Sequence, residues 1–145
     1  MVDSKRLDPL VLLAANREQA AARELGRSRD RLKEQELRLD ELMRFREDCA
    51  DKLRHASNRG LGVGQLQGYQ RFLSRLNEAI VQLEGLVDQA QREVENSRQG
   101  WFEERSRKRA LHHAADRSRA HEAKQRDRVE QRENDERGQR RRDEG

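Results

Sequence analysis

A strict alternation of three- and four-residue steps in the second half of the chain constrains its fold more than any other feature. Apolar or small residues occupy both seam positions, a and d, of five successive heptads. They are Leu66, Tyr69, Leu73, Leu76, Ile80, Leu83, Val87, Ala90, Val94, Ser97 and Trp101. An α-helix meets a partner helix along such a stripe, whereas a β-strand has a different period. The pattern therefore predicts one half of a coiled coil.

A second run with the same spacing lies upstream, and its a and d positions from Val11 to Ala56 are mostly apolar or small. Four polar residues interrupt it: Glu18, Ser28, Gln35 and Arg46. Such residues either set the register of a coiled coil or contact a partner where the seam is broken. Between the two runs, residues 57–64 contain three glycines, which is typical of a turn. The sequence thus predicts an all-α fold, a long antiparallel two-helix coiled-coil hairpin with an extended, charged C-terminal helix.

The composition excludes an ordinary globular core. Charged residues make up 41% of the chain and hydrophobic residues only 32%. A coiled coil needs only a stripe two residues wide per heptad, which this composition can supply. Disorder is the alternative for so charged a chain, but the regular spacing over residues 8–114 argues against it there. For the C-terminal tail, disorder stays open.

Local signals place the boundaries of the two helices. Asp8 can act as an N-cap for a helix with Pro9 in its first turn, and Gly60 can adopt the left-handed conformation that ends a helix. We expect five segments: an N-terminal tail (1–7), a first coiled-coil helix (8–58), a glycine-rich turn (59–64), a second coiled-coil helix (65–115) and a charged extension that is helical or frayed (116–145).

The antiparallel arrangement also predicts which residues face each other. In such a hairpin, the a positions of one helix face the d positions of the other. With the turn at the centre, the numbers of facing residues sum to about 122, so Leu39 faces Leu83. Farther from the turn, Ala21 faces Trp101, and a large residue beside a small one is what close packing requires. Beyond about Ala115 the seam loses its apolar residues, so we expect the pairing to end there.

No motif in the chain is typical of catalysis, metal binding or a cofactor. The glycines at 60, 62 and 64 resemble a phosphate-binding loop, but no strand precedes them and no Lys-Ser or Lys-Thr pair follows. None of the three C-terminal histidines has another at the i,i+3 or i,i+4 spacing that a metal site on a helix needs. Cys49, at a d position, is either a small core residue or a reactive thiol. We therefore expect no enzyme, no metal and no cofactor.

The mixed charge does not favour nucleic-acid binding, and the single cysteine, which cannot form an intramolecular disulfide, suits a reducing compartment such as the cytoplasm. Basic and acidic residues number 32 and 28, so the net charge of +4 is spread over mixed-sign helix faces. A basic coiled coil that binds nucleic acid through Arg137, Arg140, Arg141 and Arg142 stays an alternative, and so does a self-assembling structural coiled coil. In a hairpin each helix covers the apolar seam of the other, so no second chain is needed and we expect a monomer. No apolar run is long enough to span a membrane, and the run 9–15 merges into the heptads, unlike a signal peptide.

One flank of the predicted hairpin is apolar beside the seam. In an antiparallel hairpin the g positions of both helices share a flank, and here they include Phe45, Phe72, Ala79 and Leu86. Two phenylalanines on the rim of a two-helix coiled coil are poorly buried by the coil itself. The flank is therefore either a protein interface or a widened edge of the core.

The segment from Gln65 to Ile80, which reads QLQGYQRFLSRLNEAI, resembles the second-helix signature of the flagellar export protein family FliJ. The preceding sequence Phe45-Arg46-Glu47, the glycine-containing turn and the distance to Trp101 also resemble that family. The resemblance covers roughly residues 7–115, and its most specific part is 69–80.

This resemblance implies a cytoplasmic antiparallel coiled coil of the flagellar type III secretion apparatus, similar to the central stalk of rotary ATPases. Its implied partners are the hexameric export ATPase, the cytoplasmic domain of the membrane export gate and the export chaperones. The gate would hold the protein peripherally at the inner-membrane flagellar base. The family's gate-binding surface maps onto Leu42, Phe45, Phe72, Leu76 and Ala79. The stalk of an injectisome secretion system is the nearest alternative.

The end of the hairpin that carries both termini is densely charged, which suits the polar lumen of an ATPase ring. If this end enters the ring, we expect three arginines to form salt-sensitive pairs with carboxylates of the ring: Arg105, Arg107 and Arg109.

Overall fold

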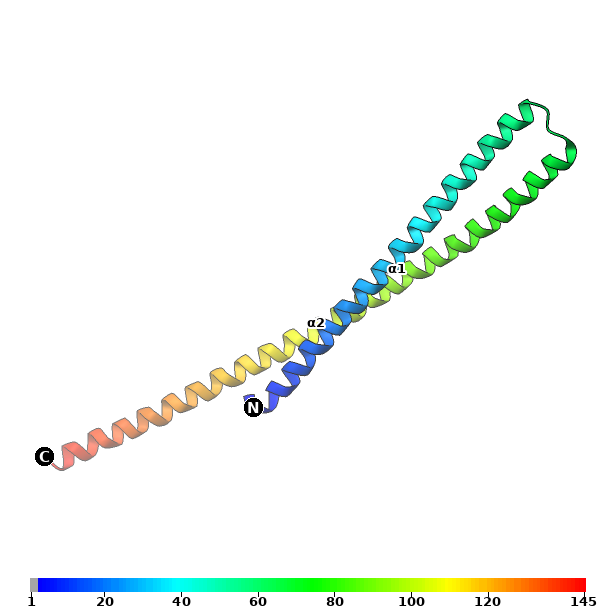
Figure 1. The fold of residues 1–145 in the computed structure, drawn as a ribbon. Helices are drawn as coiled ribbons and strands as arrows, with labels where there is room; N and C mark the ends of the chain where they lie inside the picture. The colour runs from blue at the N-terminus through cyan, green and yellow to red at the C-terminus, as the bar shows by residue number, and fades with distance from the viewer. Residues whose placement is uncertain (1–2) are drawn as a thin grey trace. The chain divides into compact units, whose positions relative to one another are not determined.

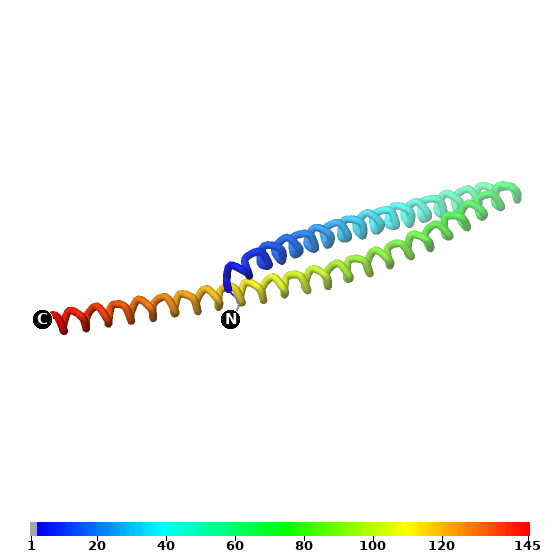
Figure 2. Tube along the Cα trace, turned by 90° about the horizontal axis from the view of Figure 1, so that it is seen from below, coloured from blue at the N-terminus to red at the C-terminus, as the bar shows by residue number. Residues whose placement is uncertain are grey.

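The computed structural model describes residues 3–145, which form two long helices, α1 (Ser4–Asn58) and α2 (Val63–Asp143), with no strand in that range. The helices contribute to two compact units. Unit 1 combines α1 up to Ala21 with α2 from Trp101 onward, and unit 2 consists of residues 22–100. Within each unit the two helices lie side by side and run antiparallel (Figures 1 and 2). The predicted all-α, two-helix fold is confirmed.

The burial of side chains follows the predicted heptads. On α1, every a and d position from Ser4 to Ala56 is buried or half-buried. On α2 the same holds from Leu66 to Glu122, with Tyr69 as the exception. No helix within residues 3–145 has a stretch that is both long and apolar enough to span a membrane.

Unit 2 holds the larger apolar side chains of the core. Leu25, Leu76, Ile80 and Ala90 are buried, and Ile80 is only 1% exposed. The polar seam residue Ser28 is also buried, and its hydroxyl donates a hydrogen bond to the carbonyl of Leu25 at 3.0 Å. Because the helix itself satisfies this hydroxyl, the serine avoids the cost of an unpaired buried polar group.

The end of unit 2 near the loop is packed more loosely than its centre. All seam positions from 49 to 73 are half-buried or exposed, and none is buried. Tyr69, which the seam pattern placed in the core, is 44% exposed. Tyr69 lies within the first two turns of α2, next to the loop, where the seam ends and a large ring has fewer neighbours to cover it.

Gly60 ends α1 in the way that the sequence predicted. Its φ of 88° lies in the left-handed region, where a residue without Cβ is unstrained. The last turn tightens through bonds from the Arg59 amide to the Ala56 carbonyl at 3.1 Å and from the Gly60 amide to the Ser57 carbonyl at 3.2 Å. α2 then begins at Val63, two residues before the predicted Gln65.

The predicted start of α1 at Asp8 is wrong, because the helix begins at Ser4 and contains Pro9. Asp3 caps it, and its Oδ1 accepts a bond from the Lys5 amide at 3.2 Å. Glu122 of α2 adds a second cap. Its Oε1 accepts from the Ser4 amide at 3.0 Å, and its Oε2 accepts from the Ser4 hydroxyl at 2.8 Å. These bonds satisfy amides of the first turn and so stabilise a helix start five residues before Pro9.

The predicted end of the pairing at Ala115 is also wrong. Ser118 is only 2% exposed and Glu122 is half-buried, so the seam of unit 1 continues past that residue. The physical reason is the early start of α1, which supplies one more turn for α2 to pack against. Beyond residue 123 every residue of α2 is exposed, yet the helix continues to Asp143. The extension predicted as helical or frayed is therefore helical to that residue.

Candidate protein-binding surface

The most prominent apolar feature of unit 2 is a pair of phenylalanine rings on its g flank. Phe45 of α1 and Phe72 of α2 meet edge to face, with ring centroids 6.1 Å apart and ring planes 84° to each other. This arrangement is favourable for aromatic quadrupoles. The two residues nevertheless remain 50% and 44% exposed. Half of the apolar area of this pair is therefore available to a partner.

A hollow of about 520 Å³ adjoins Phe72 at the loop end of unit 2. Its lining residues are Leu61, Gln65, Gly68, Tyr69 and Phe72. Gly68 has no side chain to fill the hollow, and no heavy atom lies within 4 Å of the place where a Cβ would stand. We call Phe45, Tyr69 and Phe72 together with this hollow the aromatic surface. It is shallow and open, which suits a side chain or helix of another protein better than an enclosed small molecule.

The structure divides the five residues of the predicted gate-binding set into surface and core. Phe45 and Phe72 lie on the surface, whereas Leu76 is only 7% exposed. Leu42 and Ala79 are half-buried, so they border the rings without projecting far into solvent. Leu76 is thus part of the buried core and not of the exposed surface. That the set binds a partner stays a prediction.

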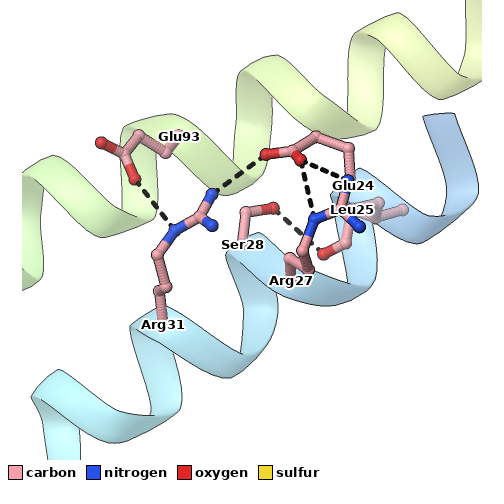
Figure 3. Close-up of polar contacts among 6 residues, drawn as sticks. All are labelled: Glu24, Leu25, Arg27, Ser28, Arg31 and Glu93. Carbon is pink, nitrogen blue, oxygen red and sulfur yellow. Dashed lines mark hydrogen bonds and ion pairs between the residues drawn. The ribbon is translucent and has the colours of Figure 1, made fainter. Parts of the chain in front are cut away.

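Farther from the loop, the same flank carries ionic contacts in place of aromatic rings, and Figure 3 shows these contacts. Arg31 extends between two carboxylates. Its Nη2 lies 3.0 Å from Glu24 of its own helix and its Nε lies 3.7 Å from Glu93 of α2. Hydrogen bonds from Arg31, and next from Arg27, hold the pKa of Glu24 below its usual range. Because all these groups are about half exposed, the network contributes little stability.

The opposite flank of unit 2 carries a polar link across the seam. Nη1 of Arg46 donates to Oδ1 of Asn77 at 3.2 Å. Arg46 occupies an a position, and its long stem lets the charged head reach the edge of the seam. This bond favours the interpretation of Arg46 as a register residue.

The three arginines predicted to contact an ATPase ring lie in unit 1 and differ in their surroundings. Cζ of Arg105 lies 5.2 Å from the centroid of the Trp101 ring, a cation–π arrangement. Nη1 of Arg107 lies 3.5 Å from Glu104, and Arg109 is exposed. Two of the three therefore already interact with residues of their own helix. Their contact with a ring stays a prediction.

Sequence reasoning missed a polar cluster in the seam of unit 1. Trp101 was paired with Ala21, but its Nε1 donates to Oε1 of Glu18 at 3.0 Å. Lys108 approaches the other carboxylate oxygen of Glu18 at 3.8 Å. The available signal was Glu18 itself, because a carboxylate at an a position needs a donor from the facing helix. Trp101 and Lys108 were the seam residues able to supply one.

The fold defines a class of protein, the all-α antiparallel helical hairpin. The family model described as "Flagellar FliJ protein" matches residues 4–143. The chain therefore belongs to the FliJ family of flagellar proteins. The matched range extends well beyond residues 7–115, which the resemblance in sequence covers. No curated protein and no solved structure matches the chain. Membership of the family supports a role related to flagellar protein export.

Proposed function

We propose that the chain is a non-enzymatic stalk and escort component of the flagellar type III export apparatus. In this role it binds the hexameric export ATPase and the cytoplasmic domain of the membrane export gate, and it escorts export chaperones. It acts as a monomer in the cytoplasm and associates with the inner membrane only peripherally, through the gate. Membership of the FliJ family supports the assignment of the chain to flagellar protein export.

The observation that carries the proposed gate contact is the exposure of the Phe45–Phe72 pair. Elsewhere on the same flank the g positions hold charged residues such as Glu24 and Arg31, so a coiled coil of this kind does not need aromatic residues there. Fully burying a phenylalanine stabilises a complex by roughly 1.5–3 kcal/mol, and half of that remains available from each ring. An apolar segment of the gate would gain this free energy on binding.

The test is the double variant Phe45→Ala/Phe72→Ala against the purified cytoplasmic domain of the gate. We expect binding to weaken about 100-fold, because each half-exposed ring supplies on the order of 1–1.5 kcal/mol. Isothermal titration at two salt concentrations measures this, and the binding of the parent chain should depend little on salt. Binding that weakens steeply with salt would instead indicate an ionic or nucleic-acid-type contact.

A matched control is Leu37→Ala/Val81→Ala, which removes two exposed apolar side chains outside the g flank. This variant should bind like the parent chain. Circular dichroism should show the same helix content for all three proteins. A loss of helix content in the phenylalanine variant alone would mean that the rings are part of the core, and the proposed gate contact would fail.

A further inference from the structure

The loop end of unit 2 lacks the buried side chains that hold the two helices together elsewhere in that unit. We call residues 47–71 the loop segment, which consists of the last turns of α1, the loop and the first turns of α2. None of its seam positions is buried. In the adjoining part of α2, Leu76, Ile80 and Ala90 are buried. Because apolar burial stabilises in proportion to area, separating the helices costs less free energy in the loop segment than next to it.

Polar links between the helices also end at the base of the loop segment. Among residues 3–145, the link nearest to the loop is the hydrogen bond from Nη1 of Arg46 to Oδ1 of Asn77 at 3.2 Å. The edge-to-face contact of Phe45 and Phe72 lies at the same level of the hairpin. Within the loop segment, side-chain packing alone therefore joins the two helices.

The first turns of α2 contain a glycine that the packing does not require. In the part of the chain that the structure describes, the only glycine with a positive φ is Gly60, so Gly64 has no need of left-handed freedom. A Cβ at Gly64 would meet no heavy atom within 4 Å, and Gly64 does not line the hollow of the aromatic surface. Glycine lowers the stability of a helix because its unfolded backbone has more freedom to lose. The sequence of the loop segment thus favours opening, as its packing does.

The aromatic surface depends on both helices, because Phe45 belongs to α1 and Phe72 belongs to α2. An opening that reaches the base of the loop segment separates the two rings. We infer that the loop segment opens and closes as a unit while the rest of unit 2 stays folded, and that a partner bound to both rings holds it closed. A partner that binds only the closed form shifts the equilibrium toward that form. The loop segment is then a conformational switch that the occupant of the aromatic surface controls.

The coupling to a partner rests on the proposed function, which supplies the cytoplasmic domain of the gate, whereas the opening itself does not. Native-state amide exchange of the free chain tests the opening. The variant Lys52→Gly/His55→Gly changes two exposed residues of the loop segment. It should lower the protection of residues 50–57 about five- to thirtyfold and leave that of residues 76–94 nearly unchanged.

The matched control is Lys33→Gly/Glu36→Gly, two exposed residues of α1 at the same spacing but outside the loop segment. It should leave the protection of residues 50–57 unchanged, because an opening confined to the loop segment does not involve the changed residues. Equal effects of the two glycine pairs on residues 50–57 would show that the whole of unit 2 opens together, and the inference would be overturned.

A second pair of variants tests the opening in the stabilising direction, so that a loss of folding cannot account for the result. Gly64→Ala should raise the protection of residues 50–57 about two- to fivefold. Gly85→Ala is the control, because it makes the same change on α2 outside the loop segment and its Cβ also meets no heavy atom within 4 Å. It should not alter the protection of residues 50–57, and an equal rise in both variants would contradict a separate opening unit.

The coupling is tested by adding the purified cytoplasmic domain of the gate to the parent chain. At a concentration ten times its Kd, the domain should raise the protection of residues 50–57 about tenfold. These residues do not line the hollow of the aromatic surface, so direct cover by the domain does not account for the rise. In Phe45→Ala/Phe72→Ala at the same domain concentration, the rise should be absent.

The outcomes separate the inference from the proposed function. If the gate domain binds the parent chain without protecting residues 50–57, the coupling is overturned while the proposed gate contact stands. If the gate domain does not bind the parent chain, the gate contact of the proposed function fails and the coupling fails with it. The glycine and alanine variants of the free chain then still decide whether the loop segment opens as a unit.

Discussion

Units 1 and 2 use the same heptad pattern but hold their helices together by different means. In unit 2 the buried seam is built from large side chains such as Leu25, Leu76 and Ile80. In unit 1, Leu7 is joined in the buried seam by alanines and serines: Ser4, Ala14, Ala115 and Ser118.

The cross-helix polar bonds show the opposite distribution. Unit 1 has the two bonds from Ser4 to Glu122, the bond from Trp101 to Glu18 and the ion pair between Asp8 and Arg119 at 2.8 Å. In unit 2 the cross-helix links Arg46–Asn77, at 3.2 Å, and Arg31–Glu93, at 3.7 Å, are longer than these bonds of unit 1.

The difference shows that the heptad pattern sets where helices touch but not what stabilises the contact. Apolar burial stabilises in proportion to area, so unit 2 gains more from its seam than unit 1. Small seam residues contribute less area and leave more of the stability to directed hydrogen bonds and charges. The stability of unit 1 should therefore depend on pH and on single polar groups. The stability of unit 2 should depend on the volume of its buried apolar side chains.

The largest effect is expected from Ile80→Ala in unit 2. Removing a fully buried isoleucine side chain costs about 2–5 kcal/mol, through lost burial and the cavity that remains. Urea denaturation followed by circular dichroism measures the change in the free energy of unfolding. The neighbouring exposed position supplies the control, because Val81→Ala should change the stability by no more than about 0.5 kcal/mol. Equal effects at both positions would show that unit 2 is not held by its apolar seam.

An intermediate effect is expected from Trp101→Phe in unit 1. The change removes the Nε1 donor and leaves the half-buried Glu18 carboxylate without its shortest hydrogen bond. We expect a loss of about 1–2 kcal/mol, seen as faster amide exchange in residues 4–21 with little change in residues 22–100. Tyr69→Phe, which removes a hydroxyl from an exposed ring of unit 2, is the control and should be nearly neutral. Uniformly faster exchange along the chain would show that the polar cluster supports both units.

The smallest effect is a pH dependence at the start of α1. Hydrogen bonds from the Ser4 amide, and next from its hydroxyl, hold the pKa of Glu122 below its ordinary value of 4.5. A lowered pKa in the folded state means that the folded chain binds fewer protons than the unfolded chain. The contribution of Glu122 is therefore present above about pH 4.5 and is lost as the pH falls through the lowered value.

Comparison with Glu122→Gln tests this dependence. The parent chain should show slower exchange of the first amides of α1 than the variant at neutral pH, and the difference should disappear in acid. Glu24→Gln is the control for a lowered pKa in unit 2, and it should leave the start of α1 unchanged at every pH. A difference between parent and Glu122→Gln that persists in acid would contradict the role of the ionised carboxylate.

The sequence by itself determined the two helices, their heptad register, the left-handed Gly60 and the exposed phenylalanines of one flank. These features follow from periods and from local propensities, which depend on neighbours along the chain. The predicted seam positions matched the observed burial because a period of seven places the same stripe on a helix whatever packs against it.

Only the tertiary structure decided the features that depend on the facing helix. α1 starts at Ser4, where Asp3 supplies a local cap, and Glu122, more than a hundred residues away, supplies a second cap that no local signal contains. Tyr69 is exposed although its seam position predicted burial, and Trp101 donates a hydrogen bond to Glu18 that the heptad pattern did not predict. The heptad pattern places a side chain on one stripe of its helix, but which groups of the facing helix reach that side chain depends on how both helices pack together.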